Sequence, residues 1–69
     1  MNEVRYLTER EVSDITGFAL STLRNHRHHR RGIPYLKCGR AIRYSLGDVL
    51  SYMESHRIRT EEDHRNDWN

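Results

Sequence analysis

The sequence has few of the residues that stabilise a small protein by means other than a hydrophobic core. It has one cysteine, Cys38, so no disulfide can form within the chain. It has one proline, and no apolar run is long enough for a signal peptide or a transmembrane helix. These scarcities exclude a disulfide-rich secreted domain and a membrane-spanning one. We expect a cytoplasmic protein without membrane contact, folded as one small domain with a modest core.

Acidic residues are missing from the middle of the chain. The net charge is only +2, but residues 15–47 contain none of the ten acidic residues and seven of the twelve Lys and Arg residues. If the fold keeps this span together, the molecule has one strongly positive side. The alternative is an ordinary solvated surface, on which we would expect acids to be interspersed with the bases.

Two short helices are predicted in the first half of the chain. Thr8 and Glu11 have the spacing of a capping box, which predicts a helix that begins at Glu9 and ends at Gly17. Helical spacing resumes in ALSTLRNHRHH, which has no apolar residue after Leu23. Such a helix must face water or a charged partner. Two short helices joined by a glycine-containing turn are typical of a helix-turn-helix motif.

Apolar spacing also predicts which helix faces lie in the core. Val12 and Ile15 are expected to face inward from the first helix. Gly32 is expected to end the second helix. A third helix should begin after Ser45, with Asp48 at the capping-box position. Its core face is expected to consist of four residues at helical spacing: Leu46, Val49, Leu50 and Met53.

Two short alternating runs around Gly39 predict a β-hairpin. In this prediction Lys37 and Arg43 both point away from the core, and Arg40 lies near the tip. The fold class is then mainly α with a small β-hairpin: a winged helix-turn-helix with a two-stranded wing and a third helix. We expect this domain to span residues 1–56, followed by a polar, flexible tail over residues 57–69. The role of Trp68 in that tail is open.

A metal site and an enzyme active site are the less favoured interpretations. The candidate metal ligands are His26, His28, His29 and Cys38. Successive helical positions diverge by about 100°, and the four nearby arginines would repel a dication. No phosphate loop or nucleophile–base arrangement appears. We therefore expect no catalytic residue, no metal and no cofactor, with a metal-dependent binder as a rival hypothesis.

The basic span suits DNA. Guanidinium groups bind phosphates and guanine edges, and short polar side chains occupy the half of a recognition helix that meets base edges. The candidate DNA-binding residues are Ser21, Thr22, Arg24, Asn25, Arg27, His28, Lys37, Arg40 and Arg43. Arg30 and Arg31, at the helix end, either contact phosphate or complement the helix dipole. No aromatic set is interleaved with these bases, which argues against single-stranded RNA.

The order of five short motifs supports this interpretation. They are Y-L-T-x-x-E-V, T-G-F, S-T-L-R, P-Y-L-K-x-G-R and I-R-Y, between Tyr6 and Met53. In this order they resemble the winged-helix proteins related to the MerR DNA-binding domain, among them phage excisionases and AlpA-type regulators. These proteins often have tryptophan where His26 stands, so we expect His26 to pack against the body.

The resemblance implies that the second helix enters the major groove of double-stranded DNA, with the wing on the backbone or minor groove. It implies an excisionase-like recombination directionality factor or a small transcriptional regulator in the bacterial nucleoid. An integrase and adjacent copies of the same chain, binding DNA cooperatively, are then the expected partners. The alternative is a phage DNA-packaging or protein-interaction module with the same fold.

Overall fold

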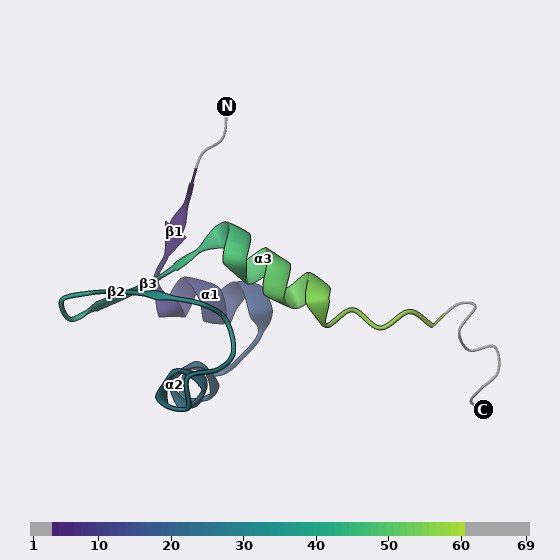
Figure 1. Cartoon of the computed structure of the whole chain (residues 1–69), viewed down its shortest axis with the longest axis horizontal. Helices are drawn as coiled ribbons and strands as arrows, with labels where there is room; N and C mark the ends of the chain where they lie inside the picture. The colour runs from purple at the N-terminus through teal and green to yellow at the C-terminus, as the bar shows by residue number, and fades with distance from the viewer. Residues whose placement is uncertain (1–3, 61–69) are drawn as a thin grey trace.

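The computed structural model describes residues 4–60 of the chain. Their elements in chain order are β1 (Tyr6–Leu7), α1 (Glu9–Thr16), α2 (Leu20–His28), β2 (Leu36–Cys38), β3 (Ala41–Ser45) and α3 (Leu46–Ser55). Figure 1 shows α2 end-on beneath the molecule, with the β2–β3 hairpin projecting to one side and α3 extending to the other. The predicted winged helix-turn-helix is confirmed. No helix of the described residues has the length and apolar character that crossing a membrane requires.

The sheet has one strand more than the sequence predicted. β3 pairs with β2 on one side and with β1 on the other, both antiparallel. β1 has only two residues, Tyr6 and Leu7, which is too short for an alternating pattern to reveal a strand. Leu7 lies opposite Tyr44, so the start of the domain is fixed beside the core.

The helix boundaries set by local hydrogen bonds are as predicted. Thr8 Oγ1 accepts a hydrogen bond from Glu11 N at 3.2 Å, and Glu11 Oε1 accepts one from Thr8 N at 2.9 Å. These bonds complete the capping box that starts α1. Gly17 ends α1 in the left-handed conformation, with φ 83°. Ser45 caps α3 by accepting a hydrogen bond from Asp48 N at 3.1 Å.

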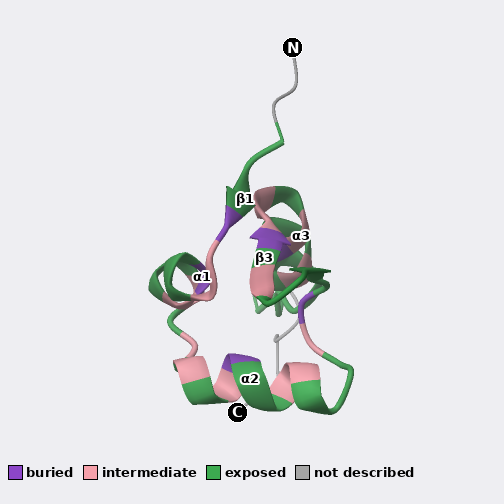
Figure 2. Ribbon diagram, turned by 90° about the vertical axis from the view of Figure 1, so that its left-hand side faces the viewer, coloured by how far each residue is buried: buried purple, intermediate pink, exposed green. Residues whose placement is uncertain are grey.

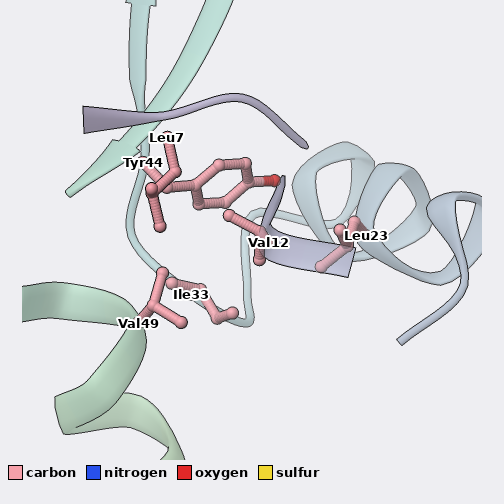
Figure 3. Packing of buried hydrophobic residues seen from close by; sticks show 6 residues of the cluster. All are labelled: Leu7, Val12, Leu23, Ile33, Tyr44 and Val49. Carbon is pink, nitrogen blue, oxygen red and sulfur yellow. The ribbon is translucent and has the colours of Figure 1, made fainter. Parts of the chain in front are cut away.

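The core is small and lies where the two strands β1 and β3, the three helices and the segment before β2 come together. Figure 3 shows its six buried residues: Leu7, Val12, Leu23, Ile33, Tyr44 and Val49. Four further side chains pack against them while remaining half-buried: Phe18, Ile42, Leu46 and Tyr52. Burying each large apolar side chain contributes about 1.5–3 kcal/mol. With so few of them, single contacts at the edge of the core matter for stability.

Three residues predicted for the core are exposed instead. Ile15 and Leu50 are each 49% exposed, and Met53 is 37% exposed. α3 begins at the residue after β3 ends, so the strand fixes the direction of the helix and only a narrow side of it meets the sheet. That side runs through Leu46, Val49 and Tyr52, at three-residue intervals. The prediction that Leu50 and Met53 face the core is therefore wrong.

The hairpin register separates Lys37 from Arg43, contrary to the prediction. Lys37 lies opposite Ile42, and directly opposite residues share a face of the sheet. Side chains of the neighbours Ile42 and Arg43 alternate, so Lys37 and Arg43 lie on opposite faces. The two-residue turn at Gly39 and Arg40 sets this register, and Gly39 has the positive φ of 64° that a type II′ turn needs at its first central position.

α2 ends four residues before the glycine predicted to end it. Arg30 N donates to Arg27 O at 3.0 Å, and Arg31 N donates to His26 O at 2.9 Å, which are the two bonds of a Schellman motif. Arg30 occupies the left-handed position of this motif, with φ 56°. Gly32 has a separate role, because a Cβ there would lie 2.7 Å from His26 Nδ1.

His26 packs against the body, as predicted. Its ring meets Phe18 edge-on, with ring centroids 6.3 Å apart. Its Nδ1 is buried and has no hydrogen-bond partner within the described part of the chain. Residues 57–60 follow α3 without helix or strand, and the rest of the predicted tail, including Trp68, lies outside the described residues.

Candidate nucleic-acid interface

One side of α2 carries four of the nine candidate residues in a single exposed stripe. Ser21, Arg24, Asn25 and His28 are all exposed. Their spacing of three, four and seven residues from Ser21 places them on one face of a helix. Figure 2 shows α2 along the bottom of the molecule, with its buried part turned toward the body. The fifth candidate near this stripe, Thr22, is half-buried.

The start of α2 leaves backbone donors open. Ala19 occupies the N-cap position, and no side chain accepts a hydrogen bond from the first turn. The N–H groups of Thr22 and Leu23 both donate to Ala19 O, so the open donors of the first turn are the N–H groups of Leu20 and Ser21. Together with the positive end of the helix dipole, they favour an anion such as phosphate at this end of the stripe.

A cleft of about 370 Å³ lies between the wing and α2. Its lining includes Arg27 from α2 and both Arg40 and Arg43 from the wing. The fold therefore brings three bases of the acid-free span to one place. Lys37 is exposed on β2 but does not line this cleft. Arg43 Nη1 donates to its neighbour's backbone oxygen, Ile42 O, at 2.8 Å.

Glu9 lies among these basic residues, which sequence analysis did not predict. Arg24 Nη2 lies 2.5 Å from Glu9 Oε2, and Arg27 Nη2 lies 3.1 Å from Glu9 Oε1. Glu9 precedes the acid-free span and reaches its arginines because α1 packs against α2. Two of the nine candidates thus share one carboxylate in the free protein.

The three groups of this cluster are ionised at neutral pH, and their mutual contacts favour the ionised forms. The hydrogen bond from Arg24 is the main cause that lowers the pKa of Glu9, and partial burial opposes it only in part. Burial disfavours the charged form of Arg27, but bonds to Tyr44 and Glu9 outweigh it and raise the pKa of Arg27. The cluster therefore carries two positive charges and one negative charge.

Arg27 is bound mostly to its own protein. Its side chain is 16% exposed, compared with 57% for Arg24. Besides the pair with Glu9, Arg27 Nη1 donates to the Tyr44 hydroxyl at 2.7 Å. Arg27 Cζ also lies 5.7 Å from the centre of the Tyr35 ring, in a cation–π arrangement. Arg27 therefore connects the core to the basic surface, and few of its donors remain free for a ligand.

The candidate metal ligands do not converge. Among residues 4–60, no group of three or more His, Cys, Asp and Glu side chains is arranged to hold a metal ion. His28 and His29 lie edge-on with ring centroids 5.1 Å apart, and His29 Nδ1 lies 3.0 Å from Asn25 O. The described surface offers a ligand mainly guanidinium groups and short polar side chains.

A comparison with protein families agrees with this geometry. A family model described as a helix-turn-helix domain matches residues 6–57, from β1 past the end of α3. No curated protein and no solved structure matches the chain significantly. The matched span includes the exposed stripe of α2, the wing and the cleft between them. The chain therefore belongs to the helix-turn-helix domain family.

Proposed function

We propose that this protein binds double-stranded DNA and catalyses no reaction. The observation that carries the proposal is the exposed stripe of α2, which lies next to a wing whose arginines share a cleft with the same helix. α2 has nine residues, and at about 1.5 Å per residue its length is about 14 Å. The major groove is about 12 Å wide and admits such a helix.

The stripe supplies the chemistry for reading bases. Arg24 donates two parallel hydrogen bonds to guanine, and Asn25 pairs with adenine in the same way. Ser21 and Thr22 lie at the start of α2, where backbone N–H groups and hydroxyls meet a phosphate. His28 follows one turn after Arg24 and contacts the neighbouring base pair or its phosphate.

The wing supplies contacts that do not depend on sequence. Arg40 at the tip and Arg43 at the cleft bind backbone phosphates, and Lys37 binds one from the opposite face of the hairpin. Arg27 lies behind them and holds the wing and α2 together. If about five phosphates are neutralised, the logarithm of the binding constant falls with log salt at a slope of about −4 to −5.

The order of the five motifs supports a more specific biological role within this class. The resemblance to MerR-related excisionases and AlpA-type regulators supports an excisionase-like recombination factor or a small transcriptional regulator. A domain of this size covers little DNA, so one copy binds weakly and adjacent copies compensate by binding cooperatively. An integrase bound beside such an array is the partner we expect for the recombination role, in the bacterial nucleoid.

Binding to a random-sequence duplex, measured by fluorescence anisotropy over a range of salt concentrations, tests the proposal. We expect Arg40→Ala to weaken binding to all duplexes alike, and Arg24→Ala to reduce base preference as well as affinity. Arg57→Ala is the matched control, because Arg57 pairs with Glu54 at the end of α3. If the parent protein binds no duplex at low salt, the proposal is wrong and a protein-interaction module takes its place.

A further inference from the structure

Two arginines at the far end of α2 have no part in the interface described so far. Arg30 and Arg31 are both exposed. The ion pairs within residues 4–60 join Arg24 and Arg27 to Glu9 and join Arg57 to Glu54, and none involves Arg30 or Arg31. Their two charges are therefore more available to an outside anion than those of Arg24 and Arg27.

The backbone at Arg30 indicates that its side chain has a use outside the fold. Arg30 has φ 56°, in the left-handed region that residues other than glycine rarely adopt. This position of a Schellman motif is usually glycine. The guanidinium makes no ion pair in the described part of the chain, so the fold gains little from a side chain here. A contact with a ligand is the better explanation for an arginine at this position.

Complementing the helix dipole does not require these arginines. The carbonyl oxygens of His26 and Arg27, in the last turn of α2, already accept hydrogen bonds from the backbone N–H groups of Arg31 and Arg30. The partial charge at a helix C-terminus is about −0.5, which is smaller than the two guanidinium charges beside it. An anion next to both arginines therefore meets a net positive potential.

The surface beside them has room for a ligand that is partly anionic and partly apolar. A shallow hollow of about 490 Å³ is lined by Arg30, Arg31, Gly32, Ile33, Pro34 and Tyr35. Two cations with a proline and an aromatic ring next to them suit a phosphate together with the sugar that carries it. These residues follow directly after the last residue of α2, His28, and in Figure 2 the chain leaves that end of the helix and turns up toward the body.

The length of α2 shows which phosphate the hollow would meet. With its first turn against one strand, a helix of about 14 Å crosses a major groove of about 12 Å. Its C-terminal end then lies at the strand on the other side of the groove. We propose that Arg30 and Arg31 form a second phosphate site, which binds the DNA backbone across the major groove from the N-terminus of α2. This inference rests on the proposed function and extends it to one further contact.

The variant Arg30→Gly tests the inference without weakening the fold. Glycine relieves the left-handed strain, and its greater freedom in the unfolded chain offsets only part of that gain, so we expect the melting temperature to be at least that of the parent protein. Because one phosphate contact is lost, the salt slope for a random-sequence duplex should become less negative by about 0.9. The affinity should fall by about fivefold to tenfold at 0.1 M salt. In the double variant Arg30→Gly with Arg31→Gln, the salt slope should become less negative still.

Arg59→Gln is the matched control, since it removes the same charge from the segment beyond α3. We expect its salt slope to equal that of the parent protein. Three results would overturn the inference. Arg30→Gly with the slope and affinity of the parent would mean that the hollow binds no phosphate, while the proposed function stands. An equal loss in Arg59→Gln would mean a general effect of net charge. A parent protein that binds no duplex would overturn both proposals together.

Discussion

Replacing Glu9 by glutamine should make the protein less stable and make it bind DNA more tightly. The carboxylate of Glu9 accepts hydrogen bonds from Arg24 and Arg27 and is 24% exposed. Glutamine keeps its size but removes the negative charge. An ion pair that touches solvent contributes up to about 1 kcal/mol. A loss of that size lowers the melting temperature of a domain this small by about 4–8 °C.

The gain in DNA affinity has the same upper limit as the loss of stability. Arg24 has to leave Glu9, or share it, before it can contact a base or phosphate. The free energy that the pair contributes to the free protein is thus lost on binding. Without the pair, we expect affinity for a random-sequence duplex to rise by up to about fivefold, which corresponds to about 1 kcal/mol. Thermal denaturation and fluorescence anisotropy at 0.1 M salt measure the two effects.

Glu54→Gln is the matched control for this variant. It removes the same charge and breaks the pair between Arg57 and Glu54, whose side chains are 62% and 63% exposed. We expect little change in melting temperature and no gain in DNA affinity. A fall in both stability and affinity for Glu9→Gln would refute the reasoning. It would mean that Glu9 holds Arg24 in the orientation that DNA requires.

Three further predictions concern stability and can be measured by thermal denaturation. Gly32→Ala should cost at least about 2 kcal/mol, because a Cβ would clash with His26 in addition to backbone strain, whereas Gly39→Ala, with open space around it, should cost about 1 kcal/mol. Equal losses would contradict the packing at Gly32. Arg27→Ala should cost about 2 kcal/mol, since it leaves the Tyr44 hydroxyl without its donor; an unchanged melting temperature would mean that Arg27 serves only DNA. The pKa of Glu9 is lowered chiefly by Arg24 and that of Glu11 chiefly by the Thr8 backbone, so their contribution is complete above the ordinary pKa of 4.5 and is lost as the pH falls below it. Melting temperatures measured from pH 5.5 to 3 should therefore fall less in Glu9→Gln than in the parent, and parallel curves would contradict this assignment.

The parts of the fold that depend on neighbours in sequence could be predicted. The caps at Thr8 and Ser45 and the left-handed Gly17 involve residues within four positions of one another. Their geometry follows from side-chain type and spacing alone. The exposure of the second helix could also be predicted, because the part of it after Leu23 has no apolar residue that could be buried in a core.

The parts that depend on tertiary packing could not be predicted. Helical spacing marks Ile15 and Leu50 as apolar positions, but it does not tell how narrow the contact with a core of six buried residues is. The sides to which Lys37 and Arg43 point depend on the number of residues in one turn. The pairing of Glu9 with two arginines depends on how α1 packs against α2. A count of acids along the chain cannot show it.

Ser45 has two positions at once, as the last residue of β3 and the N-cap of α3. No loop separates the strand from the helix, so there is no hinge between them. We therefore expect the wing and α3 to move together as one rigid unit. A displacement of the hairpin should then be passed on to α3, whose exposed residues include Leu50 and Met53.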